Sequence, residues 1–486
     1  MQTNQLRRFG MVLRHELRLM KREHALWVCG VLFLLVVGYA VFNGVLQTSL
    51  RDQAQTALTS ADALNRSSQL TQLKRIMDGS EIATPFGNPA SPANMGGGLG
   101  AHYAVMPSLP LAPVALGQTD LFPSQFKVSY ASKVNFIHNN DIENPWHLLS
   151  GHFDLAFVVV YLLPLLIFAL GHNVLSGEKE DGTLRLLLSQ PLSIATLLGG
   201  KIALRAAVLL TAAVALPVVA LLVARPQTLQ TAGPAVLWAL LVGAYALFWF
   251  TAVVAVNAFG KSSAANAMTL MVSWVLLVLV VPVLINLAAA YVHPAPSRAE
   301  LATQTRVATA LAMRDHAALL STDYGHMDES DALIPRDGHL KITGRPLGHA
   351  RVERQVDATM APELERFDQQ IARQQALVAR YSMLSPAAAA FEGMTTLAGT
   401  SQRRHAHFMR QIDTYHKEWK NFFLPRIEAS RALTPEDFPR IPVFNWQEED
   451  SDAVRHQALL ALAQLLTPTA LLLAIACWRL RRYRVV

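Results

Sequence analysis

The residues best suited to act on another molecule lie in a polar segment, residues 171–201, between two apolar stretches. Three acids precede a Gly–Thr pair and a short apolar run, and the members of this pattern are Glu178, Glu180, Asp181, Gly182, Thr183, Leu184, Leu187 and Leu188. Acids in this position favour a helix N-terminus through the helix dipole. Pro191 ends the helix and Ser193 can cap the next one. We expect a short amphipathic helix that docks on a partner and passes motion to the membrane; an ordinary interfacial hairpin is the alternative.

A second segment, residues 255–262, nearly matches the Walker A loop that binds nucleotide phosphates, with Ala255 where the first Gly of that motif stands. A functional phosphate loop follows a strand and opens a helix of an α/β nucleotide domain. Here the segment joins two apolar stretches, and no Walker B acid follows it. We therefore predict that the chain binds no cofactor of its own and that any ATP is bound by a partner.

Histidines raise the question of a metal site. His405 and His407 lie in a predicted helix, where positions i and i+2 point to different sides, so they do not bind one ion together. A looser group comprises His138, Asp141, Glu143 and His147. No pair has ligand spacing, so we expect solvated or capping residues and no metal. The chain also lacks the H-E-x-x-H and G-x-S-x-G motifs, so we predict no protease or other enzyme activity.

The elements that position these residues are membrane spans. The 486 residues are 52% hydrophobic and only 16% charged, whereas a soluble protein has about a quarter charged residues. A span needs about 20 mostly apolar residues. The predicted spans are 25–46, 153–170, 202–223, 235–256, 265–291 and 458–478. The expected fold class is therefore an α-helical polytopic membrane protein with six transmembrane helices, in contact with the lipid bilayer. Asp154, at the edge of the second span, is expected to be an interfacial anchor, with a role at the mouth of a transport path as the alternative.

The distribution of Lys and Arg predicts the orientation. These residues concentrate in 1–24, in 171–201 and in the tail 479–486, while the long segments 47–152 and 292–457 are nearly neutral. By the positive-inside rule, both termini and the 171–201 loop are cytoplasmic, and the two long segments are extracytoplasmic domains. The net charge of +7 therefore reports topology, and we expect no nucleic-acid partner.

The segments outside the spans have different characters. Residues 1–24 predict a basic amphipathic helix along the cytoplasmic interface, with a solvated basic arm as the alternative. In the first long segment a helix continues outward to about Met77, and the Pro- and Gly-rich residues 84–116 are expected to lack regular structure. The second long segment is mainly helical in pattern, and its expected helices are 298–320, 351–381 and 402–423.

The polar segment between the second and third spans resembles a family signature. Residues 178–184, 187–193 and Lys201 are similar to the pattern E-x-E-x-G-T-L…L-L-S-x-P-[VL]-S…K of type-2 ABC exporter permeases. The two large insertions resemble a bacterial branch of that family, akin to permeases of copper-enzyme-maturation and gliding-motility transporters. The stretches that carry this second resemblance are 117–123, 294–298, 397–400 and 444–446.

The resemblance implies a permease subunit in the bacterial inner membrane. Two permease subunits, identical or different, would face each other, and each would dock through residues 177–189 onto a separate ATP-binding subunit. The coupling residues it implies are Glu178, Glu180, Gly182, Thr183, Leu184, Leu187 and Pro191. The large insertions leave an alternative open, in which the same ATPase cycle moves the outer domains to regulate a periplasmic or envelope protein and nothing is transported. The substrate is not indicated by any residue pattern.

Overall fold

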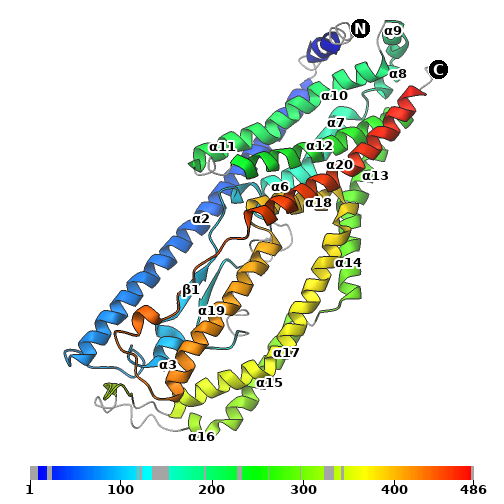
Figure 1. The fold of residues 1–486 in the computed structure, drawn as a ribbon. Coiled ribbons are helices and arrows are strands. Elements are labelled where there is room, and N and C mark those ends of the chain that lie inside the picture. The colour runs from blue at the N-terminus through cyan, green and yellow to red at the C-terminus, as the bar shows by residue number, and fades with distance from the viewer. Residues whose placement is uncertain are drawn as a thin grey trace.

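The computed structural model describes residues 9–18, 24–117, 119, 123–133, 153–190, 193–226, 232–260, 262–295, 297–321, 333–340 and 344–482. Within these residues the fold is elongated and almost entirely helical (Figure 1). A bundle of apolar helices forms one part, and long helices from the two insertions form the other. We call the described residues of 47–133, 297–384 and 399–450 the insertion domain.

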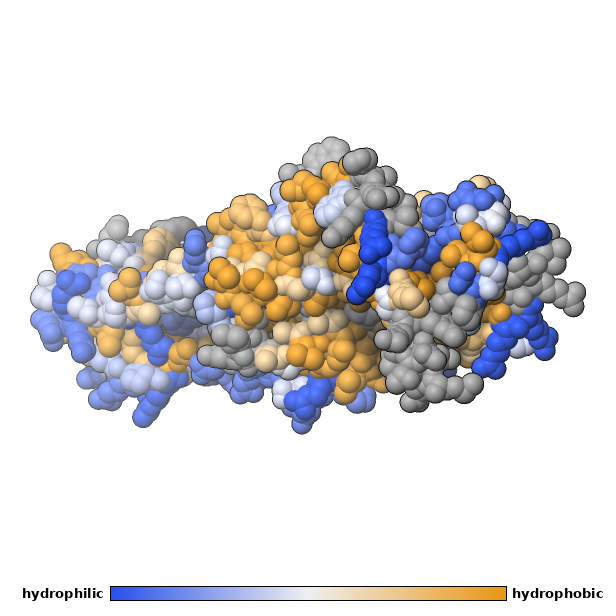
Figure 2. Space-filling view, turned by 90° about the horizontal axis from the view of Figure 1, so that it is seen from above, coloured by the Kyte–Doolittle hydropathy of each residue, from blue (hydrophilic) through white to orange (hydrophobic). Residues whose placement is uncertain are grey.

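The described residues contain six helical stretches that are long and apolar enough to cross a membrane. They are Trp27–Met77 (in α2), Leu155–Glu180 (α6, η3, α7 and α8), Ile194–Ala224 (α10, η4 and α11), Ala232–Phe259 (α12), Ser263–Val292 (α13, η6 and α14) and Ser451–Arg481 (α20). Each predicted span overlaps one of them. Figure 2 shows apolar residues gathered in a broad band over the spans, with more hydrophilic residues toward both ends. The predicted α-helical polytopic fold is confirmed.

Helix α12 lies at the centre of the bundle. Its Trp238, Tyr245 and Trp249 side chains are all but completely buried. The Tyr245 hydroxyl donates a hydrogen bond to the carbonyl oxygen of Val160, at 2.7 Å, in the neighbouring η3 turn, Val158–Leu162. A bilayer interior offers a polar group no water, so a hydroxyl buried at this depth needs a protein partner. The aromatic face of α12 therefore sets how the neighbouring spans pack.

Helix α2 extends far beyond its span. It runs without interruption over His24–Met77, which is 54 residues, or roughly 80 Å at 1.5 Å per residue. The prediction that the first span continues as a helix to about Met77 is confirmed. Gly79 adopts a positive φ of 73° just after the helix, where the chain turns back. The outer half of α2 thus forms one edge of the insertion domain (Figure 1).

The two insertions fold together. The long helices α15 (Arg298–Asp315), α17 (Gly344–Tyr381) and α19 (Gln402–Glu428) confirm the predicted helical character of the second insertion. Trp419 of α19 is fully buried, and its indole N–H donates to the carbonyl oxygen of Gly96 in the first insertion, at 3.0 Å. Neither insertion therefore completes its hydrophobic core alone.

The Pro- and Gly-rich part of the first insertion is more ordered than expected. Strand β1, His102–Val105, pairs antiparallel with β2, Gln125–Val128, with Ala104 opposite Phe126. Ala104 and Phe126 are buried in the core that Trp419 shares. The expectation of no regular structure over 84–116 is wrong for this strand, because tertiary burial stabilises a short hairpin that local propensity does not favour.

One helix of the second insertion enters the bundle. Helix α18, Pro386–Ala398, packs between α12 and α20, and most of its side chains are buried. It was not among the expected helices, because 13 residues are too few for a span and the segment contains Pro386 and Gly393, residue types that usually mark connections. We call the end of the bundle that holds α18 and Asp154 the far end.

Candidate functional site

The polar segment singled out in the sequence lies at the end of the bundle opposite the insertion domain. Helices α8 (Ser176–Glu180) and α9 (Thr183–Ser189) stand there, near the N-terminal helix of residues 9–18 and the C-terminal part of α20 (Figure 1). The described residues of 9–18, 171–201, 257–266 and 479–482 make up what we call the short-loop end. Its elements are the N-terminal helix and the ends of the second, third, fourth, fifth and sixth spans.

Gly182 separates α8 from α9. Its φ is 72°, and it is the N-cap residue of α9. A side chain at this φ is strained, so a residue other than Gly would cost energy or reorient the helix that follows. The predicted amphipathic helix is therefore present, and its direction relative to the bundle depends on one glycine.

Glu178 ties α8 to the third span. Its carboxylate accepts a hydrogen bond from the Lys201 ammonium at 2.7 Å, and both side chains are largely buried. The Thr183 hydroxyl donates to the same carboxylate and also to the Glu178 carbonyl oxygen. One acid thus fixes α9 to α8 and α8 to α10, Ile194–Leu210.

Glu180 ties α8 to the fifth span. Its two carboxylate oxygens accept hydrogen bonds from the Ser263 backbone N–H and hydroxyl, each at 2.7 Å. Ser263 is the first residue of α13, Ser263–Trp274, where backbone N–H groups lack helical partners. The Glu180 side chain is therefore a cap for a span on which it does not lie.

Helix α9 has one face on the protein and one in solvent. Leu184 is only 2% exposed and packs with Leu175 and Leu198, and the half-buried Leu187 lies against the same cluster. Leu186 points away and is 70% exposed. Pro191, the last predicted coupling residue, lies outside the described residues. Helix α9 therefore has a buried apolar side and a solvent-facing side, on which Leu186 lies beside polar and charged residues.

The N-terminal helix packs against the start of α10. Val12 is buried, and a Cβ on Gly200 would lie 2.6 Å from its Cγ1, so this glycine allows the close approach. Glu16 is 2% exposed and accepts two hydrogen bonds from the Arg205 guanidinium, at 3.0 and 2.5 Å. Arg205 also donates to the carbonyl oxygen of Leu170, near the end of the second span. This guanidinium therefore joins three segments.

A buried amide network connects the second, fourth and fifth spans, and its residues were not among the predicted site residues. Asn257 of α12 accepts from the Leu175 N–H at 3.2 Å and donates to the Gly171 carbonyl oxygen at 3.1 Å. Asn266 of α13 donates to the carbonyl oxygen of His172 and to Asn257, at 3.1 and 3.3 Å. The available signal was two Asn residues at the ends of apolar runs, where a polar side chain needs a partner.

The segment that resembles a Walker A loop connects two spans. Helix α12 ends at Phe259, and Ser262 caps α13 by accepting from the Ala265 N–H at 3.3 Å. A Cβ on Gly260 would lie 1.6 Å from Asn266, so this glycine serves helix packing. No strand precedes the segment, as a phosphate loop requires, among the residues described around it.

The described histidines do not gather around a metal site, and the described part of the chain holds no group of three or more metal-binding side chains. His407 contacts Gln411 and the carbonyl oxygen of Gln447, at 2.7 and 3.1 Å. His138, Asp141, Glu143 and His147 lie outside the described residues.

Asp154 is a buried capping residue at the far end. It is 3% exposed and accepts from the N–H groups of Phe157 and Leu116, each at 2.7 Å. One bond caps the second span, and the other holds the first insertion against it. Of the two interpretations offered for this acid, the geometry matches the anchor.

Comparison with known proteins agrees with the signature. The model of a protein family described as ABC-2 family transporter protein matches residues 11–482, nearly the whole chain. No curated protein and no solved structure matches the chain. The chain therefore belongs to the ABC-2 family of transporter proteins, and it is a type-2 ABC permease.

Proposed function

We propose that this permease is driven by a separate ATP-binding subunit that docks on α8 and α9, and that it moves a substrate across the bacterial inner membrane. Membership of the family implies an ATP-binding partner and a multi-pass location in that membrane. The observation that carries the docking site is the two-sided character of α9, with Leu184 buried against the spans and Leu186 70% exposed.

The proposed coupling follows from the contacts of α8. A push on α9 reaches α8 through the Thr183–Glu178 contact. From there it reaches the third span through Lys201 and the fifth span through Ser263. Rigid elements joined by charge-assisted hydrogen bonds move together, and breaking the Lys201–Glu178 pair would also leave two largely buried charges unpaired.

The proposed orientation places the short-loop end in the cytoplasm. ATP is bound there, and the basic residues near the short connections and the two termini match the positive-inside rule. In this proposal the chain is not an enzyme and holds no cofactor, since its partner hydrolyses the ATP. A second permease subunit, identical or different, completes the transporter.

The test is capture of the ATPase. Full-length tagged permease is purified from its own membranes, and 8-azido-ATP crosslinking measures the amount of ATP-binding subunit that comes with it. Leu186→Asp is expected to lower that amount about tenfold or more, because a charge in the centre of an interface cannot be desolvated cheaply. The thermal stability of the permease is expected to stay within error, since the side chain is already exposed.

A matched control exists in the insertion domain. Leu64 on α2 is also 70% exposed, so Leu64→Asp makes the same change on a surface that the proposal does not use. It is expected to leave the captured ATPase unchanged. Equal capture by wild type and Leu186→Asp would contradict docking on α9, and absence of any crosslinked subunit from the wild-type sample would contradict the proposed partner itself.

A further inference from the structure

Helix α18 belongs to the second insertion, but it packs inside the bundle of spans. It lies between α12 and α20, and a Cβ on Gly393 would meet the Leu241 side chain at 2.8 Å and the Ala461 Cβ at 3.0 Å. Ala387, Ala389 and Ala390 are also buried there. Small residues on this face let the backbones of three helices approach closely, so no span can shift here without displacing α18.

Both ends of α18 are attached to the bundle side of the molecule. The Ser385 hydroxyl, at its N-cap, donates to the carbonyl oxygen of Leu277 in the fifth span, at 2.7 Å. After its C-terminus the Thr400 hydroxyl donates to the carbonyl oxygen of Ala115, at 2.7 Å. The segment containing Ala115 is in turn held by Asp154 through Leu116. Helix α18 thus contacts the second, fourth, fifth and sixth spans, and hydrogen bonds at its two ends add to these contacts.

The helices on either side of α18 are the long helices of the insertion domain. Helix α17 ends at Tyr381, only a short 3₁₀ turn before α18. Helix α19 begins at Gln402 with Ser401 as its N-cap. These connections are too short to act as flexible linkers, so a displacement of α18 acts on both long helices.

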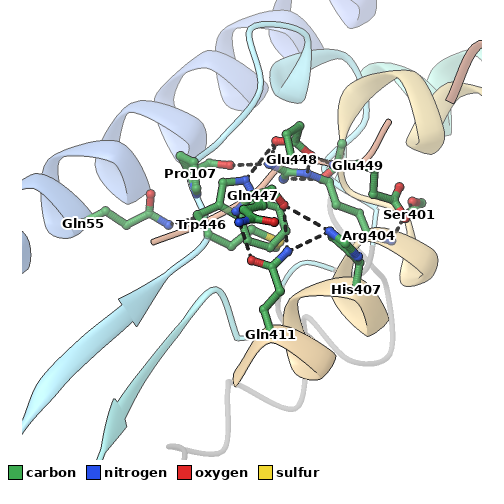
Figure 3. A network of polar contacts seen from close by, with 12 residues as sticks. Gln55, Pro107, Ser401, Arg404, His407, Gln411, Trp446, Gln447, Glu448 and Glu449 are labelled. Carbon is green, nitrogen blue, oxygen red and sulfur yellow. Dashed lines mark hydrogen bonds and ion pairs between the residues drawn. The ribbon is translucent and has the colours of Figure 1, made fainter. Parts of the chain in front are cut away.

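Arg404, in the first turn of α19, makes the second connection rigid (Figure 3). It is 4% exposed, and its guanidinium donates to the carbonyl oxygens of Gly399 and Pro107, at 2.9 and 2.8 Å. It also forms a bidentate pair with Glu448, at 2.7 and 2.6 Å, and lies over the Trp446 ring. Glu448 belongs to the extended segment that leads into α20, which begins at Ser451.

This arrangement joins four segments through one side chain: the C-terminus of α18, the start of α19, the first insertion and the approach to the sixth span. A bidentate Arg–carboxylate pair fixes orientation as well as distance. Partial movement within the joint would leave the buried guanidinium without partners, which is strongly unfavourable. The four segments are therefore expected to move as one body.

We propose that α18 and the Arg404–Glu448 clamp form a transmission joint, through which a rearrangement of the fourth and sixth spans is carried into the insertion domain. Arg404 acts here as a positioning residue. The inference goes beyond the docking of an ATPase and does not depend on it, so its failure would leave the proposed function of the short-loop end untouched.

The experiment perturbs the span side of the joint and measures the domain side. In full-length protein in lipid nanodiscs, with Cys29 and Cys477 replaced by Ala, spin labels are placed by Val223→Cys on the third span, outside the joint, and Lys417→Cys on α19. A second pair, Val223→Cys with Leu460→Cys, reports on the bundle alone. The perturbation is Gly393→Val, which forces α18 away from Leu241 and Ala461.

The expected result is a shift in both pulsed-EPR distances, the domain pair by about 2 Å or more, the size that separates rearrangement from side-chain adjustment. In an Arg404→Gln background the bundle pair is expected to shift as before, while the shift of the domain pair is lost. Arg403→Gln is the matched control. Arg403 is the adjacent arginine, pairs with the adjacent Glu449 at 3.6 Å, and is half exposed, so the domain shift is expected to persist.

Two outcomes would overturn the proposal: a domain pair that does not move when the bundle pair does, or a domain shift of equal size with and without Arg404. Should Gly393→Val fail to fold, Leu241→Ala disturbs the same contact by removing a side chain in place of adding one. The domain pair is then compared with the bundle pair, and the domain shift with and without Arg404, as before.

Discussion

Each end of the bundle is organised around a buried arginine, and the two arginines differ in what they hold. Arg205 at the short-loop end pairs with Glu16 and with the Leu170 carbonyl oxygen, so it joins the N-terminal helix to two spans. Arg404 at the far end pairs with Glu448 and two loop carbonyl oxygens, so it joins an embedded helix to the insertion domain. A buried arginine–carboxylate pair thus lies near the exposed helix α9 at the short-loop end and beside the embedded helix α18 at the far end.

This difference agrees with the proposed docking of a separate subunit at the short-loop end. At the short-loop end α9 keeps Leu186 in solvent, as suits a separate subunit. At the far end the corresponding position is filled by α18 of the same chain. A surface that must bind and release is left accessible, whereas a permanent contact is built to the packing density of a core.

The largest expected effect is the difference in lost unfolding free energy between Arg205→Ala and Arg404→Ala. Arg205→Ala leaves Glu16, 2% exposed, as an uncompensated buried charge, which costs about 3–5 kcal/mol of unfolding free energy. Arg404→Ala leaves Glu448 able to reach water, since its side chain is 40% exposed, so the main loss is two carbonyl partners, roughly 1–3 kcal/mol. Denaturant unfolding of the full chain in detergent measures both values.

Glu16→Gln tests whether the unpaired carboxylate causes the larger loss of stability in Arg205→Ala. Combined with Arg205→Ala it removes the stranded charge and is expected to recover part of the lost stability. A larger loss for Arg404→Ala than for Arg205→Ala would show that burial of the carboxylate does not decide the energy of these pairs.

A smaller effect separates two glycines of nearly equal φ. Gly182 (72°) has no other group within 4 Å of its Cβ position, whereas at Gly399 (73°) the added Cβ would meet the Leu109 side chain at 2.5 Å. Gly182→Ala is expected to cost roughly 1–2 kcal/mol, the price of the left-handed backbone alone. Gly399→Ala is expected to cost about 1–3 kcal/mol more because of overpacking. Thermal unfolding of both variants is the measurement.

Asparagine distinguishes the two causes, because it tolerates positive φ better than alanine. Gly182→Asn is expected to regain most of the stability lost in Gly182→Ala, while Gly399→Asn gains nothing, as its side chain still meets Leu109. Recovery at both positions would mean that packing around α18 is loose, contrary to the transmission joint.

The smallest effect is the response of the far-end clamp to acid. Burial opposes ionisation of Glu448, but its hydrogen bonds and charge attraction with Arg404 outweigh burial and hold its pKa below the ordinary value of a glutamate. A carboxyl with a lowered native pKa stabilises the fold above its ordinary pKa, and this stability is lost as the pH falls through the native value. The clamp is therefore expected to weaken only in acid.

The midpoint of thermal unfolding is compared between wild type and Glu448→Gln from pH 7 downward. The wild-type advantage is expected to shrink as the carboxyl protonates, because the two proteins then carry the same charge at this position. An advantage that stays constant into acid would show that the ionised carboxylate does not hold the clamp.

Much of the fold could be predicted from local pattern. The apolar runs located all six spans, and the acids before residues 184–188 indicated the helix observed at Thr183–Ser189. Helix α18 was missed because 13 residues do not have the length of a span and because Pro386 and Gly393 are residue types that usually mark connections. Glu178 and Glu180, the predicted coupling residues, were identified by type, but their contacts with Lys201 and Ser263 were not.

The sequence alone determined which segments enter the membrane, where the amphipathic helix lies and, with the family match, the class of transporter. Hydropathy and capping depend on neighbours within a few residues, so they can be deduced from local pattern. Only the tertiary structure showed that Glu16 meets Arg205, that Asn257 meets the end of the second span, and that Arg404 meets Glu448. These contacts join residues far apart in the chain. A charged or amide side chain needs a partner when it is buried, but the sequence around it does not identify that partner.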